Sequence, residues 1–221
     1  MRNGRIFRSA WKVGPMKLPR TSFHLFELGA VLCALFVPQP AVAFDQALSD
    51  EAVREAYFLG QDADRSADFL SNYVQALPMP DRGPDISQIE LRTPYAQIVQ
   101  ISQQHPNGYS AQQAAADYHR RGDYLQVRVQ VMFTPTDAGG GEDYWRSVSV
   151  GLVQKNHMAA QSVSGSPIYA TDRDGDSSWI IGANVLVVFA VAPVNSGSVQ
   201  VEAIAPGGPA VHATFDLSEL R

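Results

Sequence analysis

The feature that most constrains the fold of this chain is a repeated alternation of apolar and polar residues in its second half. Apolar residues occupy every second position in residues 125–131, and the positions between them carry Gln, Arg and Gln. The same period recurs in residues 147–152, 199–203 and 211–215, whereas residues 185–191 are apolar throughout. A period of two is typical of half-buried β-strands, and a short run that is apolar on both faces indicates a central strand.

Weaker segments of this kind lie at Ile89–Arg92, Tyr95–Ile101 and Val163–Tyr169. They bring the expected number of strands to about eight, separated by turns rich in Gly, Pro, Asn and Asp. Short strands with frequent turns are typical of two antiparallel sheets packed face to face. Residues 81–221 therefore predict a mainly β domain, an antiparallel β-sandwich of immunoglobulin-like type.

Residues 44–80 predict a helical hairpin in front of this domain. Ser49 or Asp50 is placed to cap a first helix, and Asp62 a second one, whose apolar stripe continues through Leu77. The two prolines that follow are expected to end the second helix, because proline lacks the N–H that helical hydrogen bonding needs.

One further helix is expected within the β domain, over residues 110–121. Ser110 and Gln113 have the spacing of a capping box, in which each side chain bonds the backbone N–H of the other residue. Basic residues then occupy the last turn, where the helix dipole favours them, and Gly122 follows as the helix exit.

Residues 1–43 predict a cleavable secretory signal. A basic stretch precedes an apolar run over residues 28–37, and Ala41-Val42-Ala43 offers the small side chains that signal peptidase accepts. An uncleaved membrane anchor is the alternative, but this run is far shorter than the roughly 20 residues that span a bilayer. We therefore expect export, cleavage near Ala43, a periplasmic or extracellular location, and no integral membrane span after processing. Met16 is an alternative start that leaves this expectation unchanged.

The composition of the remaining 178 residues excludes several kinds of chemistry. Residues 1–43 carry six of the 17 basic residues and one of the 22 acidic residues, so the rest of the chain has a net charge of −10. Such an acidic chain repels the phosphates of nucleic acid, and we expect no nucleic-acid partner. The only cysteine is Cys33. A processed chain therefore forms no disulfide and has no thiolate for catalysis or metal binding.

Asp172, Asp174 and Asp176 form the best candidate metal site. Alternating carboxylates beside a glycine can surround Ca²⁺, which takes six to eight oxygen ligands. The run lacks the later glycine and the distal bidentate Glu of an EF-hand, so an acidic turn between two strands is the favoured interpretation. We therefore assign no cofactor and keep Ca²⁺ as the weaker hypothesis.

For the other candidate residues, a structural role is a simpler explanation than a catalytic or binding role. Ser110 follows Gly108 as in a nucleophile elbow, but the final glycine is missing and a helix cap explains the same residues. No two of the four histidines after residue 43 have the spacing of a local zinc pair. Trp145 is expected at the start of a strand, where an exposed ring could stack on a sugar, although aromatic residues there more often cover the core.

Two segments, Glu90–Ala96 and Gly108–Ala114, together with Phe215-Asp-Leu217, resemble an uncharacterised family of exported bacterial proteins. The resemblance covers most of the chain after the signal, and it implies neither an activity nor a site. Within the first segment, Arg92 and Tyr95 predict a polar corner where the chain passes from one sheet to the other, because Pro94 interrupts strand pairing.

These observations favour an extracytoplasmic binding or protein-interaction module, whose partner is an unknown envelope or extracellular protein, or a glycan. Loops on a stable β frame suit binding, and no paired catalytic groups are visible in the sequence. The chain is therefore not assigned as an enzyme. Two alternatives stay open: a hydrolase with a site assembled from distant loops around His105 and Asp174, and a carbohydrate-binding module that uses Trp145.

Overall fold

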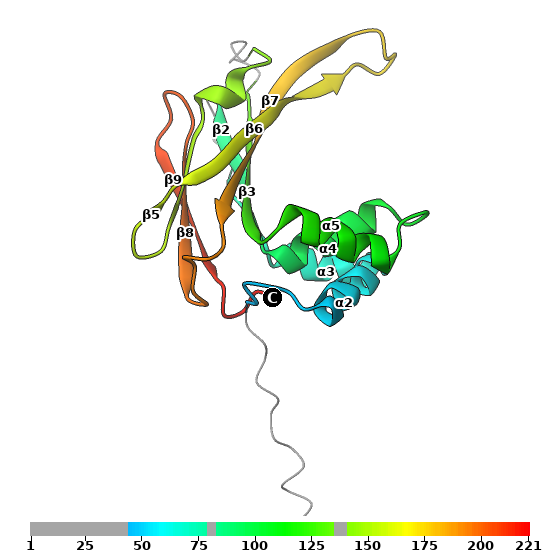
Figure 1. Ribbon diagram of the computed structural model, residues 1–221. Helices are drawn as coiled ribbons and strands as arrows, with labels where there is room; N and C mark the ends of the chain where they lie inside the picture. The colour runs from blue at the N-terminus through cyan, green and yellow to red at the C-terminus, as the bar shows by residue number, and fades with distance from the viewer. Residues whose placement is uncertain (1–43, 79–82, 135–140) are drawn as a thin grey trace, which may run out of the picture. The chain divides into compact units, whose positions relative to one another are not determined.

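The computed structural model describes residues 44–78, 83–134 and 141–221 (Figure 1). The predicted signal peptide, with Ala43, lies outside these residues. The described part contains two antiparallel sheets and four α-helices, so the fold is mixed α/β rather than mainly β. No helix in these ranges is long and apolar enough to cross a membrane.

Five strands form the first sheet and four form the second. The first has the order β1–β2–β3–β7–β6, with β1 at Val74–Ala76, β2 at Asp85–Arg92, β3 at Tyr124–Met132, β7 at Ser178–Ala190 and β6 at Ala160–Thr171. The second has the order β5–β4–β8–β9, with β5 at His157–Met158, β4 at Ser149–Val153, β8 at Ser198–Ile204 and β9 at Ala210–Asp216. Every pairing is antiparallel, which confirms the expected strand direction.

Strands of both sheets contribute to one apolar core. The alternating residues of β3 are buried toward it, as their period predicts, and β7 pairs with a strand on each side, which confirms that it is central. The register sets Val129 opposite Val185. Residues of the second sheet complete this core, among them Leu152, Val199, Val201, Ala203, Ala213 and Phe215. Burial of apolar surface at about 25 cal/mol per Å² makes such a core the main source of stability.

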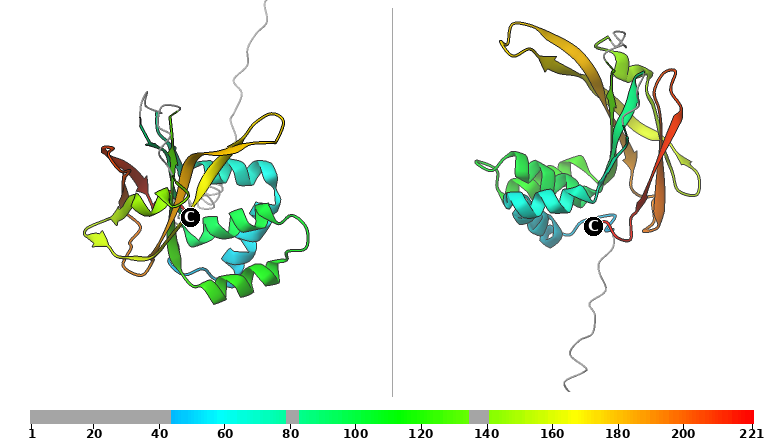
Figure 2. Two further views of the ribbon diagram at one scale, coloured as in Figure 1. Left: turned by 90° about the horizontal axis from the view of Figure 1, so that it is seen from above. Right: turned by 180° about the vertical axis from the view of Figure 1, so that it is seen from behind.

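The four helices form a second apolar cluster. They are α2 (Asp50–Gln61), α3 (Ala63–Ser71), α4 (Pro94–Gln104) and α5 (Ala111–Arg121). Figure 2 shows them grouped beside the five-stranded sheet, on the side away from the four-stranded sheet. Phe69 and Leu70 contact both apolar clusters, and so connect the helices to the sheets. Ser49 caps α2, and the capping box of Ser110 and Gln113 is confirmed at α5.

The prediction of a strand over Tyr95–Ile101 is wrong, because these residues lie in α4. The Thr93 side chain accepts a hydrogen bond from the Ala96 N–H at 3.2 Å, and Pro94 occupies the first helical position, where its missing N–H costs nothing. Tyr95 and Val99 are one helical turn apart, and both are buried in the helical cluster. The predicted corner between sheets at Arg92–Tyr95 is therefore also wrong: the chain ends β2 here and starts a helix. Two helices, not one, separate β2 from β3.

The second helix of the predicted hairpin is shorter than expected. It ends at Ser71, and Val74–Ala76 forms the edge strand β1, in which Val74 pairs with Glu90 of β2. The Tyr73 carbonyl accepts a hydrogen bond from the Leu91 N–H at 3.0 Å. The edge of β2 provides hydrogen-bond partners for the backbone of this segment. A β-branched residue such as Val74 also suits a strand better than a helix.

Candidate functional site

The long hairpin of β6 and β7 carries most of the large apolar side chains that are exposed in the described structure. β6 pairs only with β7, so its other side is a free sheet edge over 12 residues. Val163, Tyr169 and Trp179 expose 51%, 49% and 51% of their surface, and they are three of the five large apolar residues exposed in the described ranges. Long free edges and exposed apolar residues are features that monomeric proteins usually avoid.

Among the residues that the structure describes, no other strand pairs with the outer end of this hairpin. The ladder between β3 and β7 ends at Met132 and Gly182, while β7 continues outward to Ser178 opposite Thr171 (Figures 1 and 2). A side chain at Gly182 would place its Cβ 2.3 Å from the Val131 carbonyl oxygen, so glycine is needed where β3 lies against the hairpin. A bulge follows on the outer side of this glycine: Ile168 pairs with Gly182 and Tyr169 with Ile180, so Ile181 of β7 is the extra residue. Because bulges increase the local twist of a strand, this bulge changes the direction in which the outer end of the hairpin runs.

The candidate calcium residues form the turn of this hairpin, as the favoured interpretation predicted. The Asp172 carboxylate accepts a hydrogen bond from the Asp176 N–H at 2.9 Å, and Gly175 takes the left-handed conformation with φ of 79°. Asp174 and Asp176 are exposed. No group of three His, Cys, Asp or Glu side chains in the described ranges is arranged to hold a metal ion. The carboxylates of the turn thus give the hairpin an acidic end, and their arrangement lends the Ca²⁺ hypothesis no support.

Trp145 lies in a short 3₁₀ helix, η2 (Tyr144–Ser147), and not at the start of a strand as expected. Its ring packs over β6: a Cβ on Gly165 would lie 2.6 Å from Trp145 Cγ. The Arg146 guanidinium lies over the ring at 4.3 Å from its centre. Both contacts cover part of the ring surface that a sugar would stack on, so they argue against carbohydrate binding at Trp145.

The residues of the hydrolase hypothesis lie on different elements. Ser110 is used as a helix cap: its hydroxyl accepts a hydrogen bond from the Gln113 N–H at 3.2 Å. His105 ends α4, where its Nδ1 lies 2.9 Å from the Ile101 carbonyl oxygen, and Asp174 lies in the β6–β7 turn. His119 lies 2.9 Å from Asp50, and His212 is exposed on β9, as expected. No hydrogen bond joins a nucleophile to a histidine base in the described residues.

A buried ion pair at the end of β2 was not found by sequence reasoning. The Arg92 guanidinium donates two hydrogen bonds of 2.6 Å to the Glu90 carboxylate, and both side chains are over 90% buried. Nearby, the Gln97 side chain donates to the backbone oxygens of Arg92 and Tyr124, at 3.3 and 2.9 Å. The signal in the sequence was a pair of opposite charges two residues apart in a strand, which lie on the same face. The hydrogen bonds of the Glu90–Arg92 ion pair are satisfied within the protein, which indicates a structural role.

A second cluster, around Arg221, connects the helices with the end of the described chain. Arg221 donates two hydrogen bonds of 2.6 Å to Glu55 of α2, and its guanidinium lies 4.6 Å from the ring centre of Tyr95. Tyr73 donates to the Arg221 carbonyl oxygen at 2.8 Å, and burial raises the pKa of Tyr73 to about 12. Thr93 donates to the same carbonyl oxygen. These contacts fix α2 and α4 against the sheets.

The ion pair of this cluster predicts a pH-dependent contribution to stability. Hydrogen bonds from Arg221 lower the pKa of Glu55 below its ordinary value of 4.5. A lowered pKa in the folded state stabilises the fold above the unfolded pKa, and this stabilisation is lost as the pH falls through the folded pKa. Glu55→Gln should therefore lower the free energy of unfolding by about 0.5–1 kcal/mol at pH 7, since the pair is partly exposed. The difference should shrink below about pH 4.5 and then vanish, as measured by urea unfolding at several pH values.

Glu219→Gln is the matched control for this prediction. Glu219 is exposed and forms no ion pair within the described residues. A stability difference for Glu55→Gln that stayed constant from pH 7 to about pH 3 would show that the carboxylate charge is not its cause.

The comparisons with known proteins add no family to this description. No protein-family model matches the chain, and no curated protein matches its sequence significantly.

Proposed function

We propose that this chain is an exported binding module, and that the free edge of β6 takes up an extended segment of a partner protein as one more strand. A free edge carries backbone N–H and C=O groups that can pair with another strand, and strand addition is a common mode of peptide recognition. The single observation that supports this best is the combination of a 12-residue edge with exposed Val163 and Tyr169 on it.

The side chains of β6 indicate the chemistry of this partner. Val163 and Tyr169 are six positions apart in β6, and the extra residue of the bulge between them lies in β7, so the two side chains lie on the same face of β6. A partner strand beside them would gain from apolar residues at alternate positions. The turn at Asp172, Asp174 and Asp176 is acidic, and Tyr169 donates a hydrogen bond to Glu142 at 3.2 Å. Basic residues at the end of the partner that lies nearest the turn would complement these carboxylates.

Pro167 limits where this pairing can run. Proline has no N–H to donate and is confined to edge strands or bulges when it occurs in sheets. A bulge also lies between Ala160 and Ser162, so the regular part of the edge before the proline is residues 162–166. We expect the partner segment to pair along this part, and to reach the acidic turn with its flanking residues.

We further infer that the frame of this edge is an immunoglobulin-like sandwich. This inference is supported by the single apolar core that both antiparallel sheets share. Export to the periplasm or the outside of the cell, with a partner in the envelope or beyond it, is likewise part of the proposal, and it rests on the signal pattern of residues 1–43. The resemblance to uncharacterised exported bacterial proteins agrees with it.

Backbone-modified peptides test strand addition directly. A peptide selected on the purified protein from a displayed library of random 12-residue sequences should show alternating apolar residues and Lys or Arg near one end. Two versions of it are then made, N-methylated at odd or at even positions. An added strand pairs through one of its two edges only, so one version should bind like the parent and the other should lose binding by about tenfold or more, measured by fluorescence anisotropy.

Two variants locate the binding edge. Val163→Lys should abolish peptide binding, because it replaces an apolar contact with a charge that the partner's apolar side chains cannot pair. His212→Lys places the same side chain on the exposed edge strand of the other sheet, and it should bind the peptide like the parent protein. Equal loss in both N-methylated peptides, or equal binding by both variants, would contradict strand addition at β6.

A further inference from the structure

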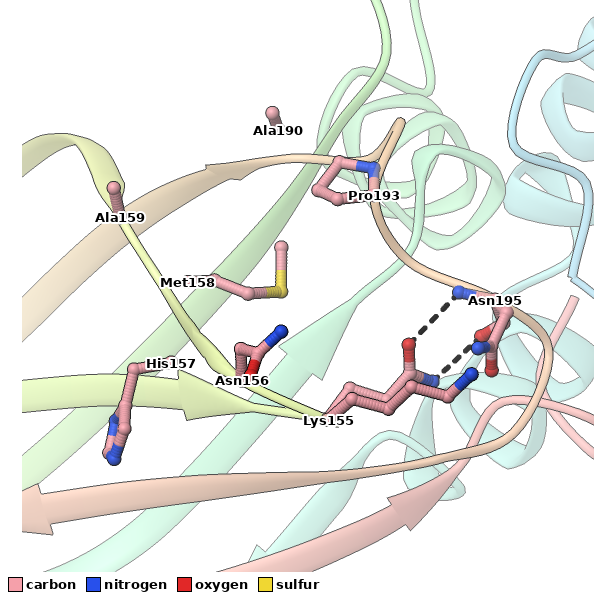
Figure 3. A pocket seen from close by; sticks show the side chains of 9 residues that line it. Lys155, Asn156, His157, Met158, Ala159, Ala190, Pro193 and Asn195 are labelled. Carbon is pink, nitrogen blue, oxygen red and sulfur yellow. Dashed lines mark hydrogen bonds between the residues drawn. The ribbon is translucent and has the colours of Figure 1, made fainter.

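A cavity of about 520 Å³ lies near the start of β6, where the turn between β4 and β5 meets the connection from β7 to β8. Figure 3 shows it from close by. Its described lining residues are Gln154, Lys155, Asn156, His157, Met158, Ala159, Ala190, Pro193 and Asn195. This volume is in the range of small-molecule sites in proteins, about 300–1,000 Å³.

One side chain holds the two walls of this cavity together. The Gln154 amide donates to the backbone oxygen of Asn195 at 3.0 Å, and the Gln154 carbonyl oxygen accepts from the Asn195 N–H at 3.0 Å. The Asn195 side-chain oxygen accepts from the Gly197 N–H, also at 3.0 Å. The two bonds between Gln154 and Asn195, which are drawn in Figure 3, connect segments about 40 residues apart. The cavity is therefore formed before any ligand binds.

The charge of the cavity is opposite to that of the rest of the chain. Lys155 is the only lysine after residue 17, in a sequence whose residues 44–221 carry a net charge of −10. None of the nine described lining residues is acidic. Within the described chain, the Lys155 ammonium forms no ion pair and donates no hydrogen bond. An unpaired ammonium at a cavity without carboxylates attracts an anion.

One side of the cavity is lined by polar groups and the other side by apolar groups. The Lys155 side chain extends toward Asn195, and Met158 points toward Pro193, whereas His157 points away from them (Figure 3). The side-chain oxygen of Asn195 is occupied by Gly197, so its amide N–H groups are free to donate. Asn156 can both donate and accept. A ligand here would meet one cation, two carboxamides and an apolar side made by Met158, Pro193 and Ala190.

We propose that this cavity binds a small carboxylate that also carries hydroxyl groups, that is, a sugar acid. The Lys155 ammonium pairs with the carboxylate, the Asn156 and Asn195 amides hydrogen-bond hydroxyl groups, and Met158 and Pro193 contact the C–H face of the sugar ring. A single cation matches a monoanion, because the second charge of a phosphate monoester would have no partner. This site is separate from strand addition at β6, and either proposal can fail without the other.

Titration calorimetry with D-galacturonate, D-galactose and D-galactose 6-phosphate tests this proposal on the purified protein. Galacturonate should bind in the millimolar range and at least about tenfold more tightly than the other two. Lys155→Met should lower the galacturonate affinity by about tenfold or more, and Lys155→Arg should retain most of it. Arg173→Met removes an exposed cation from the β6–β7 turn and should have no effect.

Each other outcome would overturn the proposal. Equal binding of galactose would show that the carboxylate is not recognised, and tighter binding of the phosphate would show a site for dianions. Unchanged galacturonate binding by Lys155→Met, or no heat with galacturonate at tens of millimolar, would also overturn it. Peptide binding at β6 should be the same in Lys155→Met and in the parent protein, which keeps the two proposals apart.

Discussion

Replacing Arg92 by methionine is expected to lower the free energy of unfolding by about 3–5 kcal/mol at pH 7. The substitution leaves the Glu90 carboxylate, which is over 90% buried, without the two 2.6 Å hydrogen bonds that it accepts. A buried charge without a partner loses its hydration and gains nothing in exchange. Urea unfolding followed by circular dichroism measures the loss.

A double variant separates the charge from the packing at this site. Glu90→Gln together with Arg92→Met removes both charges and keeps similar side-chain volumes, so it should recover most of the lost stability. A double variant as unstable as the single one would show that the Arg92 side chain acts through its packing.

Gly60→Ala is expected to lower the free energy of unfolding by roughly 2 kcal/mol, through the contact of α2 with α4. An added Cβ would lie 2.3 Å from the Val99 carbonyl oxygen and 2.6 Å from Ser102 Cβ, so the two helices must move apart. This opens the cluster in which Val53, Ala56 and Val99 are buried. The cost exceeds the 0.5–1 kcal/mol or so that alanine gains over glycine within a helix. Thermal unfolding should show the loss as a lower Tm.

Gly151→Ala is the matched control for this prediction. Gly151 lies in β4, and nothing stands within 4 Å of the position that its Cβ would take. Its unfolding temperature should therefore stay close to that of the parent protein. If Gly60→Ala were equally neutral, the close approach of α2 and α4 would not be needed for stability.

The elements that could be predicted from the sequence are those whose signal is local. Ser110 and Gln113 form their capping box from groups three residues apart, and the acidic residues at 172–176 form a turn with a left-handed glycine. The candidate binding features depend instead on contacts between distant parts of the chain. Val163 and Tyr169 were visible as part of a strand, but whether that strand lies inside a sheet or at its edge depends on which strands pair with it.

The same limit applies to the cavity at Lys155. The sequence shows that this lysine is the only one after residue 17, but Asn195 lies 40 positions away. The pairing of β4 with β8 and the hydrogen bonds of Gln154 bring these two residues to one cavity. Glu90 and Arg92 could likewise be identified in the sequence as charged residues. Their burial could not be predicted, because it depends on packing between elements that are far apart in the chain.

By itself, the sequence determined the strands of the two sheets wherever polar and apolar residues alternate, as in Leu125–Val131, because any sheet buries one face of such a strand. Residues 95–101 fit a strand and a helix about equally, since Tyr95 and Val99 share a face in both. The local cap from Thr93 and the long-range packing of α4 against α2 together decided in favour of the helix. Local order follows from neighbouring residues, whereas sheet edges, buried ion pairs and cavities depend on long-range contacts that the fold alone creates.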